Sequence, residues 1–155
     1  MKSHNSFFAL LLLFVVSYTL LPIVALADTP PIITLSVPNA VLTLEVARTI
    51  AQHEHGLMGR TELAPHHGML FVFDADSDQY FWMKNTLIPL DMVFIDSNGT
   101  VSSVAANVPA MTPGMSDAEL PRRHGIGRFV LELPAGEAVH DGFATGLHLR
   151  LPAFP

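Results

Sequence analysis

The chain has 155 residues, enough for one domain, with 8 Lys and Arg against 14 Asp and Glu and a net charge of −6 at pH 7. This acidic balance argues against a nucleic-acid surface, because phosphate binding needs clustered positive charge and the basic residues here are scattered. Cysteine is absent, so disulfides and thiol chemistry are excluded and the hydrophobic core alone must stabilise the fold.

The first 27 residues predict a secretory signal peptide. Lys2 gives the positive start, residues 7–26 are almost wholly apolar, and Ala25-Leu26-Ala27 matches a small-x-small cleavage site. A retained membrane anchor is the alternative, since a bilayer-spanning helix needs ~20 apolar residues. We expect cleavage before Asp28 and export to the periplasm or beyond.

After this segment we expect an irregular, Pro-rich lead-in at residues 28–40 and a single globular domain at 41–155. The lead-in carries a short predicted strand at 32–37. Alternation of apolar and polar residues predicts another strand at 41–46.

A short helix is predicted to begin after Thr49. Gln52 follows three residues later, which is the spacing of a capping box. Gly56 and Gly59 limit the length of this helix.

Residues 68–73 are apolar throughout, which is typical of a strand buried on both faces. The acidic segment 74–78 resembles a calcium loop in composition only. The positions that an EF-hand loop gives to Gly and Glu hold Gln79 and Asn85. We therefore expect a solvated hairpin turn at 74–78.

Two central strands are predicted at 80–84 and 90–96, joined by a connection that contains Pro89. Asn98-Gly99 is the preferred chemistry of a tight hairpin and predicts a return strand at 101–106.

Residues 107–125 contain three prolines and no periodicity, which predicts a long surface loop. A strand at 129–133, a helical stub at 137–141 and a last strand at 147–151 follow. These elements predict an α+β domain, mainly antiparallel, built as a small barrel-like or curled sheet with one short helix and the stub.

The central strands carry two charges among apolar residues, Lys84 and Asp91. A lone buried charge costs several kcal/mol, so each needs a partner. One interpretation is a structural ion pair between the two, with Arg60 or Arg128 as other partners for Asp91. The other interpretation is a polar-aromatic groove for a small polar ligand. The candidate binding residues of this groove are Arg60, Trp82, Lys84, Asn85 and Asp91.

Copper binding is an alternative, since the chain has 8 His and 7 Met and these side chains suit Cu(II) and Cu(I). The spacing argues against it, because neighbouring histidines at i and i+2 of a helix do not share a face. The candidate ligands are Met111, Met115, His53, His66 and His67. No other metal or cofactor is expected.

No hydrolase elbow, phosphate loop or zinc-hydrolase motif is present. The expected function is therefore an exported, non-catalytic binding or accessory domain for an unknown small polar ligand or envelope component. An envelope-associated enzyme that uses the same groove is the alternative from a different class.

Four segments of the chain closely resemble the domain-of-unknown-function 192 family. They are Arg48…Gly56-Leu57-Met58-x-Arg60, residues 68–73, residues 81–91 and residues 130–136. The resemblance covers about residues 38–151. It implies a small, mostly β domain, commonly exported in bacteria and also found in archaea, with no established reaction.

The chain departs from the family pattern at two places. Many relatives carry cysteines in the loop where this chain has Met111 and Met115, so a thiolate role in that loop is lost. Relatives also often have Gly-Asp where this chain has Gly146-Leu147.

Overall fold

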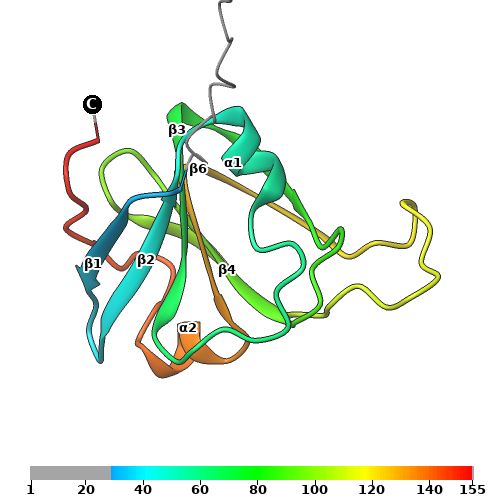
Figure 1. Cartoon of the computed structure of the whole chain (residues 1–155). Coiled ribbons are helices and arrows are strands. Elements are labelled where there is room, and N and C mark those ends of the chain that lie inside the picture. The colour runs from blue at the N-terminus through cyan, green and yellow to red at the C-terminus, as the bar shows by residue number, and fades with distance from the viewer. Residues whose placement is uncertain (1–28, 155) are drawn as a thin grey trace, which may run out of the picture.

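The computed structural model describes residues 29–154, and the predicted signal peptide lies outside them. Six strands form one sheet in the order β1-β2-β3-β6-β4-β5 (Figure 1). The elements are β1 (Ile32–Ser36), β2 (Val41–Ala47), α1 (Ile50–His55), β3 (His67–Trp82), β4 (Leu90–Ile95), β5 (Val101–Val108), β6 (Arg122–Pro134) and α2 (Glu137–His140). In the described part of the chain, no helix is long and apolar enough to cross a membrane.

The predicted fold class is confirmed. Strands β2 and β3 are parallel, and all other neighbours are antiparallel. The sheet curls without closing into a barrel, and α1 and α2 lie at opposite ends of it (Figure 1).

The capping box at the start of α1 is confirmed. The Thr49 hydroxyl accepts a hydrogen bond from the Gln52 backbone N–H at 3.2 Å, and Gln52 Oε1 accepts from the Thr49 N–H at 3.1 Å. Gly56 ends the helix with a φ of +47°, which a residue with a side chain rarely adopts. This short helix forms the crossover that the parallel β2–β3 pair requires.

The Asn98-Gly99 hairpin is also confirmed. Gly99 has a φ of +87°, and its N–H donates to the Asp96 carbonyl at 2.9 Å. The strand β5 that returns from this turn is longer than predicted and extends to Val108.

The hairpin turn predicted at 74–78 is wrong, because β3 continues through this segment as one strand of 16 residues. Its register against β6 shifts between Val72 and Ser77, so a bulge bends the strand without ending it. The polar side chains of residues 74–78 are exposed to solvent, so their place in a strand requires no burial of polar groups.

The predictions for the C-terminal part need two further corrections. Strand β6 begins at Arg122, so the loop predicted at 107–125 is shorter than expected. Arg122 and Arg123 belong to β6 and pair with β3. The last predicted strand, 147–151, forms no ladder, and the chain makes a single bridge between His148 and Thr100.

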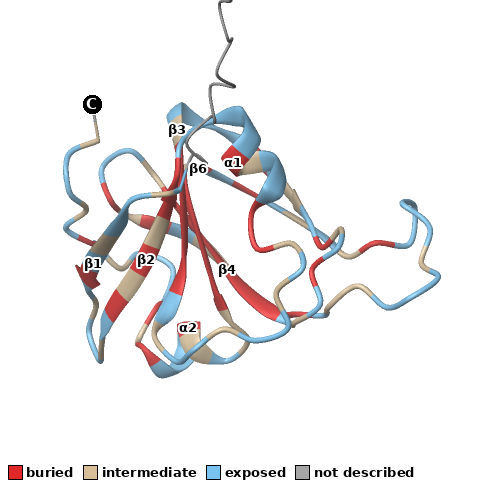
Figure 2. Ribbon diagram, in the orientation of Figure 1, coloured by how far each residue is buried: buried red, intermediate tan, exposed pale blue. Residues whose placement is uncertain are grey.

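The two predicted central strands do not pair with each other, because β6 lies between β3 and β4. All six residues of β4 are buried, so this strand packs on both faces (Figure 2). Val93 and Ile95 join one core cluster, and Met92 and Phe94 join the other. Successive side chains of β4 therefore point to opposite faces of the sheet.

Candidate functional site

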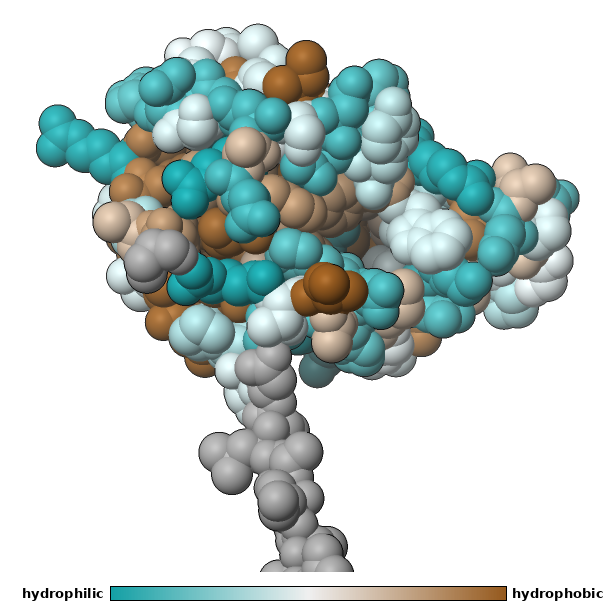
Figure 3. All heavy atoms as spheres, turned by 90° about the horizontal axis from the view of Figure 1, so that it is seen from above, coloured by the Kyte–Doolittle hydropathy of each residue, from teal (hydrophilic) through white to brown (hydrophobic). Residues whose placement is uncertain are grey.

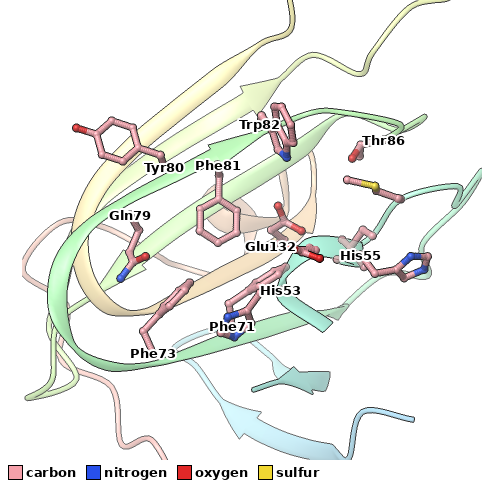
Figure 4. Close-up of a pocket in the computed structure, with 14 residues that line it drawn as sticks. His53, His55, Phe71, Phe73, Gln79, Tyr80, Phe81, Trp82, Thr86 and Glu132 are labelled. Carbon is pink, nitrogen blue, oxygen red and sulfur yellow. The ribbon is translucent and has the colours of Figure 1, made fainter. Parts of the chain in front are cut away.

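A cavity of about 250 Å³ lies between α1, the turn that follows it, and β3. Its walls are largely aromatic, and Glu132 of β6 contributes a carboxyl group to its lining (Figure 4). The aromatic side chains of the wall are Phe71, Phe73, Phe81 and Trp82. We call this space the Glu132 cavity.

Glu132 occupies a central position of the sheet. Its neighbours in register are Met69 on β3 and Met92 on β4, so apolar side chains flank it on both sides. The residue is 5% exposed, and burial alone raises the pKa of its carboxyl group to about 8. No hydrogen bond or positive charge from the described residues offsets this burial. At neutral pH the cavity therefore contains a largely protonated carboxylic acid.

The aromatic wall is held in a fixed arrangement. Phe71 and Phe81 pack edge to face with ring centroids 4.9 Å apart. His53 of α1 lies 4.6 Å from the Phe73 ring, and its Nε2 is 3.0 Å from the Ala47 carbonyl oxygen. His53 thus fastens α1 over the wall.

Two aromatic residues of the lining, Trp82 and Tyr80, are exposed. Trp82 is 43% exposed, and Lys84 Nζ lies 4.8 Å from the centre of its ring. Tyr80 points away from the carboxyl group in Figure 4 and stacks on His124. On the face seen in Figure 3, at the α1 end of the molecule, apolar residues line a hollow between hydrophilic ones.

The predicted ion pair between Lys84 and Asp91 is wrong. Lys84 Nζ lies 3.2 Å from Asp117 Oδ2, on the surface loop before β6. The backbone N–H of Asn85 donates to Met111 Sδ at 3.3 Å, and its carbonyl accepts from Gly59. Lys84 therefore lies over the Trp82 ring, and neither Lys84 nor Asn85 lines the cavity.

Asp91 is fully buried and cannot line an open groove. Its Oδ1 accepts the backbone N–H of Asn107 at 2.7 Å, and its Oδ2 accepts that of Ala138 at 2.8 Å. Backbone donors thus satisfy this carboxylate in place of the predicted cation. The residue ties β4 to the end of β5 and to α2.

The two arginines that were expected near Asp91 lie elsewhere. Arg60 forms a bidentate ion pair with Glu45, with N–O distances of 2.6 and 2.7 Å. Arg128 Nε donates to the Phe73 carbonyl at 3.1 Å. Of the five predicted binding residues, Trp82 lines the Glu132 cavity.

Four of the five predicted copper ligands contact other groups. Met111 contacts Asn85, His53 contacts Ala47, and His67 Nδ1 lies 3.0 Å from the Pro65 carbonyl. His66 instead belongs to a cluster at α2, described below.

Glu132 was not among the predicted site residues. A signal was present, because Glu132 is a single carboxylate in the apolar run 129–133. Such a residue in a strand buried on both faces must either find a partner or accept a shifted pKa. The cavity also gathers residues from all four segments on which the family resemblance rests. These residues are Gly56, Leu57, Met58, Phe71, Phe73, Phe81, Trp82, Thr86 and Glu132.

Comparison with known proteins gives one family and two similar solved structures. The model of DUF192, described as Uncharacterized ACR, matches residues 33–151. A Sinorhizobium meliloti 1021 protein, named as a candidate transcription regulator, is 33% identical, with a TM-score of 0.69 over 80% of this chain and 96% of its own. A Novosphingobium aromaticivorans DSM 12444 protein of unknown function is also 33% identical, with a TM-score of 0.64 over 77% of this chain and 85% of its own. No curated protein matches the chain.

Proposed function

Since the chain belongs to the DUF192 family, whose description assigns no activity, we propose a function from the cavity itself. The protein is a binding module that takes a small organic molecule into the Glu132 cavity. The observation that carries this proposal is a buried carboxyl group without an offsetting partner, placed at an aromatic cavity. Burying such a group opposes folding, so its presence is explained when it serves a ligand.

The lining indicates the chemistry of the ligand. Aromatic walls favour a ring or a short aliphatic body, since apolar surface is removed from water on both sides. The Glu132 carboxyl group favours a head that donates hydrogen bonds, and most of all an ammonium group, which would stabilise the ionised form. A carboxylate head would be repelled when Glu132 is ionised.

Trp82 is the single tryptophan of the chain and lines the cavity, so its fluorescence reports occupancy directly. The test is a titration with four compounds that share one ring: benzylamine, benzamide, benzyl alcohol and benzoate. We expect benzylamine to bind best and benzoate worst, and Glu132→Gln to abolish the preference. Glu62→Gln, at an exposed carboxylate outside the cavity lining, is the matched control. If all four compounds leave Trp82 unchanged, or Glu132→Gln keeps the same order, the proposal fails.

An enzyme that uses the same cavity is the second candidate. The pKa of Glu132, about 8, favours it, because a catalytic acid or base works best when its pKa is near the ambient pH. A panel of p-nitrophenyl esters and glycosides tests this candidate. Turnover that Glu132→Gln abolishes would favour the enzyme over the binding module.

We also propose that the module acts after export, on the basis of the predicted signal at residues 1–27. N-terminal sequencing of the protein recovered from a Gram-negative host tests this. A first residue of Asp28 in the periplasmic fraction is the expected result. An intact N-terminus in the membrane fraction would support the anchored alternative instead.

Nucleic-acid binding, which the name of the Sinorhizobium neighbour would suggest, is not part of the proposal. The net charge of −6 opposes it. Arg122, in the adjacent basic pair, donates to the carbonyls of Asp117, Ala118 and Leu120 and so serves its own loop. A gel-shift assay at low salt should show no complex with duplex DNA.

A further inference from the structure

A second cluster of chemically active side chains lies at the opposite end of the sheet from α1, around α2. His66, just before β3, meets three residues of the α2 turn: Glu137, His140 and Asp141. Residues at i, i+3 and i+4 of a helical turn lie on one face, which places these three together. From this cluster we propose a binding site for a divalent transition-metal ion, represented by zinc.

The distances fit such a site. His66 Nδ1 lies 3.2 Å from Glu137 Oε2 and 3.1 Å from Asp141 Oδ2, and His140 Nδ1 lies 2.9 Å from Asp141 Oδ1. One atom from each of the four residues can be chosen so that all lie within 4.8 Å of one another. In a tetrahedral zinc site with bonds of about 2.1 Å, the ligand atoms are about 3.4 Å apart. His140, whose side chain is largely exposed, has room to turn toward such an ion.

The ligand set selects the class of metal. Two imidazoles with two carboxylates suit zinc and its neighbours in the first transition row. Calcium and magnesium prefer oxygen ligands throughout, so they fit poorly. No thiolate is present in the chain to favour a softer ion.

Parts of the site are held in place before any metal binds. The Asp141 side chain is fully buried, and the ion pairs recorded for Asp141 and Glu137 in the described chain are to histidines. The His66 carbonyl accepts from the Thr43 N–H at 2.8 Å, and the His66 N–H donates to Glu137 Oε2 at 3.2 Å. The buried Asp141 carboxylate therefore faces the Nδ1 atoms of His66 and His140. A metal ion would bind between the carboxylate and these two nitrogen atoms.

Four protein ligands leave no open position on a tetrahedral ion, so the expected role is structural. The ion would clip α2 to the start of β3. Asp91 already holds the same helix through the Ala138 N–H. A metal ion here would add a second attachment of α2 to the sheet. None of its four ligands lines the Glu132 cavity.

The test uses the full chain without a histidine tag, stripped with a chelator and titrated with zinc chloride in a calorimeter. We expect one zinc per chain with a dissociation constant in the micromolar range or below. At zinc 100-fold above this constant, the melting temperature should rise by about 5 to 10 °C. Cobalt(II) in place of zinc should give the visible absorption of a tetrahedral ion.

The variants separate this site from random surface binding. His140→Ala removes a largely exposed side chain and should fold normally, yet weaken zinc binding at least tenfold. His66→Ala should do the same. His67→Ala is the matched control, since His67 is adjacent to His66 but lies outside the cluster. Absence of zinc binding up to about 100 μM, or an equal loss in His67→Ala and His140→Ala, would overturn the proposal.

Discussion

The buried carboxyl group of Glu132 predicts an unusual dependence of stability on pH. Its pKa rises from 4.5 in an exposed reference to about 8 in the folded protein. Between these values the folded chain keeps a proton that the unfolded chain has released. The free energy of unfolding therefore falls as the pH rises through this window, by roughly 1.4 kcal/mol per pKa unit or about 5 kcal/mol in all.

Replacing the carboxyl group by an amide removes this dependence. Glu132→Gln keeps the shape of the side chain and cannot ionise, so it should match the wild type near pH 4.5. At pH values above 8 it should be more stable by up to about 5 kcal/mol, which is a large part of the stability of an ordinary domain.

Urea unfolding followed by Trp82 fluorescence, at a series of pH values from about 4.5 to 9, measures the difference. Glu62→Gln removes an exposed carboxylate and controls for the loss of one charge. If the curves of wild type and Glu132→Gln run parallel across the whole range, Glu132 does not carry a raised pKa. The Glu132 cavity would then contain an ordinary ionised carboxylate.

Three further predictions concern other parts of the fold. Asp91→Ala should cost about 3 kcal/mol in urea unfolding, because it leaves two backbone N–H groups without their acceptor, and a loss below 1 kcal/mol would contradict this. Lys84→Ala should change stability by less than about 0.5 kcal/mol, since its pair with Asp117 is exposed, and a loss above 1 kcal/mol would restore a structural role for Lys84. Thr49→Ala should cost about 1 kcal/mol and speed amide exchange in α1, whereas unchanged exchange would argue that tertiary packing alone holds the helix.

The features that were predictable from sequence are those with local causes. The capping box at Thr49 and the turn at Asn98-Gly99 each depend on a few adjacent residues, and both formed as predicted. The burial of β4 on both faces could also be predicted, because all its residues except Asp91 are apolar. The apolar runs were therefore enough to give the fold class.

The errors arise where distant parts of the chain decide the outcome. The polar segment 74–78 looks like a turn, but pairing with β6 keeps β3 extended through a bulge. The partners of Asp91 are backbone groups 16 and 47 residues away, which no side-chain pattern reveals. The role of Glu132 likewise depends on which strands flank β6. The order of strands in the sheet cannot be predicted from any single segment of the chain.

The position of β6 in the sheet has a consequence for the order of assembly. This strand enters late in the chain yet lies between β3 and β4, so both earlier strands keep an unpaired edge until it is inserted. A polypeptide shortened before Arg122 would leave two partial sheets with open edges and no shared centre, a state inclined to aggregate. Native structure must therefore wait until nearly the whole molecule has been synthesised, and folding should be slow for a protein of this size.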